Sequence, residues 1–143
     1  MAKDIFHNTL RTALEKDGWL ITHDPLTINL SKRRIFIDLG AEKLLFADKD
    51  HIKIAVEVKS FLGLSILNDF YKALGQYQLY LLALKHQYPD RILYLAIPIE
   101  SYQLLISDEL LADFLQELSI NWIVYHPNKT NIISWINEPT IKK

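Results

Sequence analysis

The sequence predicts a single α/β domain over residues 1–143, in which helices flank a mixed β-sheet. Its 143 residues are about the length of one ordinary domain. Half of the residues are hydrophobic, while Gly and Pro number only 4 and 5, a composition typical of a chain with one packed core. Hydrophobic periodicity changes several times between helical and strand spacing, which indicates that helices and strands are interleaved.

The first half of the chain is predicted to contain one helix and three strands. Apolar residues recur at helical spacing before Gly18, a residue type that commonly ends a helix. Asp24-Pro25 is a turn-forming pair, and β-rich runs follow it. The predicted elements are a helix over 4–16 and strands over 19–23, 34–39 and 51–60, of which the last two form a hairpin.

The second half is predicted to add two helices and further strands. Helical periodicity returns before Pro89, and Ser107, followed by two acidic residues, is a suitable N-cap for another helix. The predicted elements are helices over 68–86 and 107–118, strands over 91–98, 122–125 and 132–136, and a frayed tail over 137–143. This order indicates a mixed sheet with helices around it.

The charge balance gives no general attraction for nucleic acid. Lys and Arg number 16 and Asp and Glu 17, so the net charge is −1. Any contact with DNA therefore has to be local. The one compact basic run, Lys32-Arg33-Arg34, suits either a phosphate contact or, more commonly, a solvated strand end.

Composition also indicates the compartment. The chain contains no Cys, which excludes disulfides and thiolate metal sites and suits a reducing cytoplasm. Charges at Lys3, Asp4 and Arg11 interrupt the N-terminal region, and no uncharged apolar run approaches the about 18 residues that cross a bilayer. We therefore expect a cytoplasmic protein with neither a signal peptide nor a membrane span.

Two predicted strands carry charged side chains among apolar ones. In the strand over 51–60, alternate side chains are apolar, and Glu57 and Lys59 share the other face. In the strand over 34–39, the same alternation lets Asp38 face the cleft that Glu57 faces. A simple Glu57–Lys59 ion pair on a solvated strand face is the alternative interpretation.

The spacing of these residues resembles a nuclease signature. Asp38 followed by Glu57-Val58-Lys59 resembles the Asp…(Asp/Glu)-x-Lys pattern of the PD-(D/E)XK superfamily, whose fold is restriction-endonuclease-like. On the next helix, Gln76 and Tyr80 resemble the Gln-x-x-x-Tyr element of RecB-like nucleases in this superfamily. These two residues lie one helical turn apart and face together.

The chemistry that such residues support is metal-dependent phosphodiester cleavage. Mg²⁺ prefers a few carboxylates together with water and substrate oxygens. Asp38, Glu57 and the backbone carbonyl of Val58 would bind Mg²⁺, with Mn²⁺ as a substitute. Lys59 would orient the attacking water or stabilise negative charge on the phosphorane. The neutral pair on the next helix would hold a phosphate or the water network.

His7 is a further candidate on the first helix. It flanks the apolar face of that helix, whereas Glu15 points nearly away from it. Lining the site is nevertheless the less common role for a lone His beside an apolar stripe, which is usually packed or capped. No zinc site is expected, because metal-ligand spacing is missing from the other histidines, namely His23, His51, His86 and His126.

Segments distributed over nearly the whole chain resemble the XisH family. They are AKDIFH (2–7), LEKDGW (14–19), ITHDPL (21–26), IDLGAE (37–42), AVEVKSF (55–61), ALGQY (73–77) and AIP (96–98). The resemblance implies a restriction-endonuclease-like fold. It also implies a role in excising a DNA element, the cyanobacterial fdxN element, together with a site-specific recombinase and a small partner, XisI.

Two functions remain open from the sequence. The first is a Mg²⁺-dependent endonuclease that acts on DNA, and the second is a non-catalytic accessory factor that binds DNA or protein and regulates a site-specific recombinase. The stretch over 79–84 has apolar residues all round the helix, which indicates full burial or cover by a partner chain. We therefore also expect a homodimer.

Overall fold

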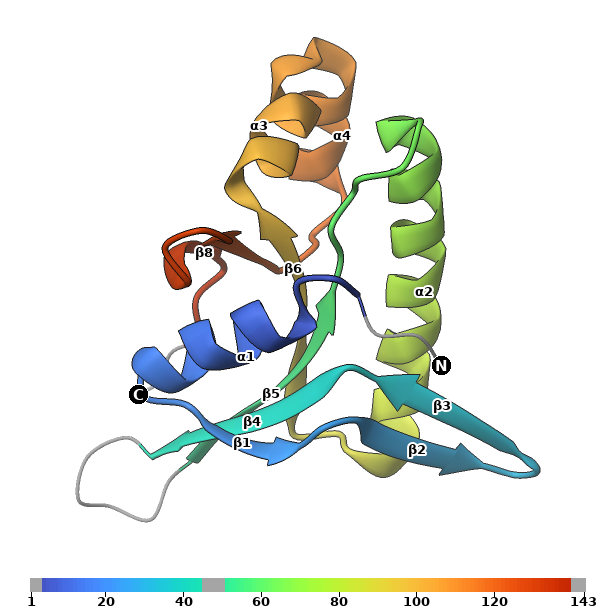
Figure 1. The fold of residues 1–143 in the computed structure, drawn as a ribbon. Coiled ribbons are helices and arrows are strands. Elements are labelled where there is room, and N and C mark those ends of the chain that lie inside the picture. Colours follow the sequence, from blue (N-terminus) through green and yellow to red (C-terminus); the bar gives the residue numbers. More distant parts are fainter. Residues whose placement is uncertain (1–3, 45–50, 140–143) are drawn as a thin grey trace.

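The fold is built on a six-stranded mixed β-sheet with helices on both faces (Figure 1). The computed structural model describes residues 4–44 and 51–139. The strand order is β1-β4-β5-β6-β7-β8, in which the β5–β6 and β6–β7 pairs are parallel and the other pairs antiparallel. The strands are β1 (Leu20–His23), β4 (Leu39–Leu44), β5 (His51–Val58), β6 (Arg91–Pro98), β7 (Trp122–His126) and β8 (Asn131–Ile136).

The central strands contribute to two cores, one on each face of the sheet. Leu93 and Leu95 of β6 face α2, whereas Tyr94 and Ala96 face α1. Burial on both faces is characteristic of parallel strands inside a sheet. The structure thus confirms a mixed sheet flanked by helices, which are α1 (His7–Lys16), α2 (Ile66–Gln87), α3 (Ile99–Ser107) and α4 (Glu109–Glu117).

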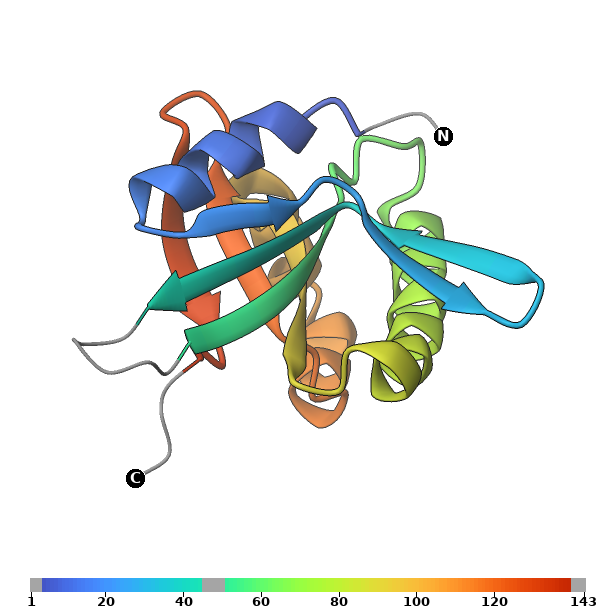
Figure 2. The same ribbon diagram turned by 90° about the horizontal axis from the view of Figure 1, so that it is seen from below.

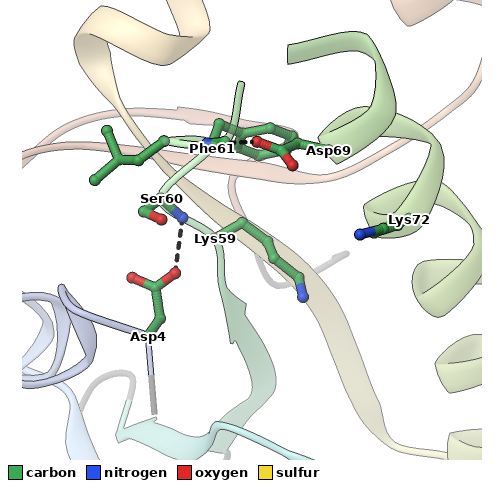
Figure 3. A pocket seen from close by; sticks show the side chains of 8 residues that line it. Asp4, Lys59, Ser60, Phe61, Asp69 and Lys72 are labelled. Atoms are coloured by element: carbon green, nitrogen blue, oxygen red, sulfur yellow. Dashed lines mark hydrogen bonds between the residues drawn. The ribbon is translucent and has the colours of Figure 1, made fainter. Parts of the chain in front are cut away.

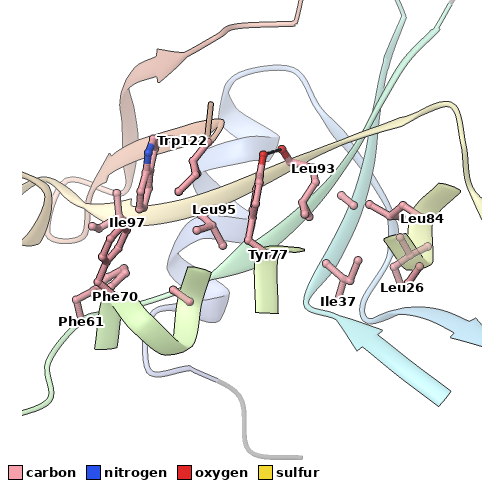
Figure 4. Close-up of a cluster of buried hydrophobic side chains, with 14 of the residues drawn as sticks. Leu26, Ile37, Phe61, Phe70, Tyr77, Leu84, Leu93, Leu95, Ile97 and Trp122 are labelled. Atoms are coloured by element: carbon pink, nitrogen blue, oxygen red, sulfur yellow. Dashed lines mark hydrogen bonds between the residues drawn. The ribbon is translucent and has the colours of Figure 1, made fainter. Parts of the chain in front are cut away.

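The inner face of α2 forms much of the larger core. Phe70, Ala73, Tyr77 and Leu84 recur at helical spacing and are buried (Figure 4). The Tyr77 hydroxyl donates a hydrogen bond of 3.5 Å to the carbonyl of Leu93. The structure thus confirms the predicted second helix.

None of the helices in the described ranges is both long enough and apolar enough to cross a membrane.

A separate hairpin of β2 (Leu26–Leu30) and β3 (Arg33–Ile37) lies beside the main sheet. The predicted single strand through Asp38 does not form, because the chain bends there and β4, not β3, is the antiparallel partner of β5. Ile37 is buried beneath α2, whereas Leu39 is buried beneath α1. The apolar pattern hides the bend because both residues are core residues, although they lie on opposite faces of the sheet.

Two helices follow β6 where the sequence predicts one. Helix α3 begins directly after Pro98, in a stretch for which the sequence predicts no element. The carboxylate of Asp108, not the hydroxyl of Ser107, caps α4 by accepting hydrogen bonds from the amides of Leu110 and Leu111. The Ser107 hydroxyl instead donates to a carbonyl in the last turn of α3.

The chain remains tied to the sheet just after β8. Asn137 falls in the predicted frayed tail, yet its carbonyl accepts a hydrogen bond from the Tyr94 hydroxyl. Its side-chain amide also donates to Asn121 Oδ1 over 3.0 Å. Asn137 is therefore hydrogen-bonded to the body of the domain, whereas residues 140–143 of the predicted frayed tail lie outside the described part of the chain.

The outer face of α2 bears on the predicted homodimer. Within the apolar stretch over 79–84, Ala83 and Leu84 are buried in the core. Leu79 and Leu82 are 63% and 57% exposed, so full burial within one chain does not explain this stretch. A second copy that covered these side chains would remove apolar surface from water.

Light scattering tests this expectation. Wild-type protein is expected to have twice the monomer mass, and the double variant Leu79→Glu/Leu82→Glu is expected to be monomeric, because it would place charges in the interface. Leu20→Glu, which changes an exposed leucine of β1, is the matched control and should remain dimeric. A monomeric wild type, or a double variant that still dimerises, would contradict the homodimer.

Candidate functional site

Asp38 and Glu57 are held together by reciprocal hydrogen bonds at the end of β5. The Val58 amide donates to Asp38 Oδ2 over 2.8 Å, and the Asp38 amide donates to Glu57 Oε1 over 3.2 Å. Each carboxylate therefore accepts a backbone hydrogen bond from the segment that carries the other. The bend after β3 brings Asp38 to this position, so the two predicted ligands lie together although Asp38 is not on the predicted strand.

Glu57 is buried beside another negative charge. It is 6% exposed, and burial together with the Asp38 carboxylate raises the pKa of Glu57 to about 8. Lys59 Nζ lies 3.3 Å from Glu57 Oε2 and opposes this shift. The two side chains are thus within ion-pair distance, but the glutamate is buried and does not lie on a solvated strand face.

Tyr80 reaches the same region from α2. Burial, followed by the negative charges of Glu57 and Asp38, raises the pKa of the Tyr80 hydroxyl, which therefore stays protonated and can donate a hydrogen bond at neutral pH. Gln76 lies one turn earlier on the helix, and its Oε1 is buried with no hydrogen-bond partner in the described part of the protein. Such an acceptor costs about 1–3 kcal/mol unless a donor reaches it.

His7 approaches Asp38 from the other side of the sheet. It is 2% exposed, its Nε2 lies 2.7 Å from Asp24 Oδ1, and its Nδ1 lies 4.0 Å from Asp38 Oδ1. Arg11 Nη1 donates to the second oxygen of Asp24 over 2.6 Å. A chain of polar groups therefore leads from α1 to the site. Glu15 is exposed and pairs with Arg11, as expected from its direction on the helix.

Asp24 is a residue of this network that the sequence pattern did not reveal. It precedes Pro25, and the pair was interpretable simply as a turn. A carboxylate close to His7 becomes recognisable only when β1 returns alongside α1, and neither the spacing nor the residue type indicates that contact. The structure thus adds Asp24 as the group that orients the His7 ring.

A pocket of about 180 Å³ adjoins Lys59. Figure 3 shows the side chains of Lys59, just after β5, and Lys72, on α2, pointing toward the same space. An acidic side chain holds the loop that forms the pocket, since Asp4 Oδ2 accepts a hydrogen bond from the Ser60 backbone N–H over 2.9 Å. The complete lining is Asp4, Lys59, Ser60, Phe61, Leu62, Gly63, Asp69 and Lys72.

The donor atoms fit a hard cation better than zinc. Over residues 4–44 and 51–139, no three His, Asp or Glu side chains cluster so as to hold a metal ion. The available set is the carboxylates of Asp38 and Glu57 and the backbone of Val58. In an extended strand the N–H and C=O of one residue point to the same neighbour, so the Val58 carbonyl points to the edge that Asp38 occupies. Mg²⁺ commonly uses one or two carboxylates and keeps several waters.

Glu57→Gln is expected to reduce the pH dependence of stability. The folded-state pKa of Glu57 is raised, so the unfolded chain releases this proton first as the pH increases. The contribution of this group is fully present below its ordinary pKa of 4.5 and is lost as the pH rises to about 8. Melting temperatures between about pH 5 and pH 8 should therefore fall more for the wild type than for Glu57→Gln.

Glu117→Gln provides the control for this measurement. Glu117 is an exposed carboxylate on α4, and its variant should follow the wild-type profile. If all three proteins lost stability equally with increasing pH, a raised pKa of Glu57 would be contradicted.

Comparisons with known proteins identify the family. The model of the XisH protein family matches residues 1–133. An XisH family protein from Nostoc punctiforme PCC 73102 has a crystal structure with a TM-score of 0.83 and 38% identity, covering 94% of this chain and 100% of that one. An fdxN element excision controlling factor protein from Anabaena variabilis matches with a TM-score of 0.82, 39% identity and the same coverages. The search of curated proteins finds no match. The chain described here belongs to the XisH family.

Proposed function

We propose that this protein takes part in controlling the excision of a DNA element, and that it does so as a Mg²⁺-dependent PD-(D/E)XK-type endonuclease. The first half of the proposal is supported by the similar Anabaena variabilis protein, which is described as an fdxN element excision controlling factor. The second half is carried by one observation, the reciprocal hydrogen bonds that bring Asp38 and Glu57 together beside Lys59.

The charges of the site favour a cation. With its pKa at about 8, Glu57 retains a proton at neutral pH because its carboxyl group is buried and Asp38 lies next to it. A divalent cation would replace that proton and neutralise both carboxylates. Asp38, Glu57 and the Val58 carbonyl would hold Mg²⁺ or Mn²⁺, which would polarise a phosphoryl oxygen of the substrate and lower the pKa of a bound water.

The remaining side chains would position the phosphate and the water. Lys59 can donate hydrogen bonds to the attacking water, or to the phosphorane oxygens as their negative charge increases. The Tyr80 hydroxyl stays protonated and can donate, while the Gln76 carbonyl oxygen can accept a hydrogen bond from the water. His7, held by Asp24, would limit the movement of Asp38.

Nuclease assays test this proposal. Purified protein with Mg²⁺ or Mn²⁺ should cleave at least one of duplex, single-stranded or branched DNA. Asp38→Asn and Lys59→Met should each reduce the rate by about 10²–10³, since each would remove an electrostatic contribution to the transition state. Asp113→Asn, on the exposed surface of α4, is the control and should cleave as the wild type does.

The result that would overturn the nuclease proposal is equally direct. It is a folded wild-type protein that cuts none of the three forms of DNA and shows no metal binding in calorimetry.

The second candidate function is a non-catalytic accessory factor that binds a recombinase, an XisI-like protein or DNA. It is favoured by uncovered apolar side chains on α4, where Leu110 and Phe114 are 60% and 43% exposed and lie one turn apart. A protein partner is the ordinary explanation of such a surface. On this account the fold would present binding surfaces, and Asp38 and Lys59 would be dispensable for function.

An excision assay separates the two candidates. If Asp38→Ala or Lys59→Ala abolishes excision while folding and partner binding persist, the accessory account is contradicted. If both variants excise normally and Phe114→Glu abolishes excision, the nuclease account is contradicted.

A further inference from the structure

The β2–β3 hairpin carries the basic run of the sequence on a projecting tip. Figures 1 and 2 both show it extending past α2 with its tip clear of the other elements. Leu30 pairs with Arg33, so Ser31 and Lys32 alone form the turn. Lys32, Arg33 and Arg34 are all exposed, and within the described ranges none of them lies within ion-pair distance of a carboxylate.

We propose that this hairpin is a contact surface for the DNA backbone, which holds phosphates at a fixed distance from Asp38 and Glu57. The inference rests on the proposed function in one respect only, namely that the protein acts on DNA. It assigns a role to the basic run that neither the family match nor the carboxylate site provides.

The hairpin has one apolar face and one open face. Leu26, Ile28 and Ile37 are buried beneath α2, and strand alternation places their neighbours on the opposite side. The cross-strand pairs on that open side are Asn29 with Arg34 and Thr27 with Phe36. The open face therefore presents a cation, an amide, a hydroxyl and an aromatic ring, which are groups that contact phosphate, sugar and bases.

The hairpin continues directly into the residue that carries the first carboxylate of the site. Strand β3 ends at Ile37, and Asp38 is the next residue. Arg34 is four residues before Asp38, which is about 13 Å at about 3.3 Å per residue. One DNA strand advances about 3.4 Å per nucleotide, so the tip would meet phosphates about four nucleotides from the phosphate at Asp38.

The position of the hairpin is fixed by contacts with α2. The backbone N–H of Asn29 donates a hydrogen bond of 2.7 Å to Gln87 Oε1, and the Tyr88 hydroxyl donates to the backbone carbonyl of Thr27 over 3.5 Å. These bonds join β2 to the C-terminal end of the helix. Because the strands are already ordered, phosphate contacts at the tip would not incur the entropy cost of ordering a loop.

The positive charges of the hairpin would attract the phosphates of DNA. The net charge is −1, and the carboxylates of the site repel phosphate, so the protein needs a local source of attraction for DNA. Arg34 on the open face and the exposed Arg33 beside the turn provide it, since guanidinium groups form bidentate hydrogen bonds with phosphate oxygens. The basic run of the sequence is on this account a phosphate contact, the less common of its two interpretations.

DNA binding without cleavage tests the inference. Fluorescence anisotropy of a labelled duplex would be measured in a chelator, so that no cation-dependent reaction takes place. Arg33→Gln/Arg34→Gln is expected to weaken binding at least about tenfold at moderate salt. The slope of log K against the logarithm of the salt concentration should fall by about 0.9 for each phosphate that the variant no longer neutralises. Melting temperature should be unchanged because both side chains are exposed.

A second double variant controls for net charge. Lys16→Gln/Lys129→Gln removes the same two charges from exposed positions on α1 and in the turn between β7 and β8, and it should bind DNA as the wild type does. Equal losses of affinity in both double variants would show a diffuse charge effect and overturn the inference. It is also overturned if the arginine variant keeps wild-type affinity, or if the wild type binds no DNA.

The same assays separate this inference from the nuclease proposal. If DNA binding depends on Arg33 and Arg34 while no DNA is ever cut, the contact surface stands and the nuclease proposal fails. If the wild type cuts DNA and the arginine variant binds and cuts equally well, the nuclease proposal stands and the contact surface fails.

Discussion

The reciprocal hydrogen bonds between Asp38 and the end of β5 are the contact on which the rest of the site depends. The Val58 amide and the Glu57 carboxylate both engage Asp38, and they do so at the bend where the chain leaves β3 and enters β4. The same bend lets Ile37 and Leu39 contribute to different cores. This bend therefore separates the projecting hairpin from β4, the strand between β1 and β5, and places two carboxylates side by side.

This arrangement is costly for the folded protein. Burying like charges costs several kcal/mol in proteins, and the raised pKa of Glu57 expresses that cost. Four buried side-chain atoms in the described ranges have no hydrogen-bond partner, and two of them, His7 Nδ1 and Gln76 Oε1, belong to the predicted site residues. Unsatisfied polar groups and adjacent carboxylates are typical of sites that bind something, because a fold selected only for stability would replace them.

The sequence predicts well the elements that strand alternation and helical periodicity determine. It predicts poorly the contacts that form only when the chain turns back on itself. The bounds of β6 and the proximity of Lys59 to Glu57 follow from residue types along one stretch of chain. Strand β2 alternates clearly but is short and follows a turn signal, so its pairing with β3 depends on the packing of both strands against α2. Helix α3 begins immediately after a strand without a side-chain cap, and Asp24 reaches His7 only in three dimensions.

The central claim is that Asp38 and Glu57 form one cation site, and Mg²⁺ titration calorimetry near pH 7 in buffers of different ionisation enthalpy tests it most directly. Because Glu57 holds a proton at this pH, binding should release about one proton per ion, and Asp38→Asn should lose binding. Absence of binding by the wild type, or binding that releases no proton and persists in Asp38→Asn, would contradict the account.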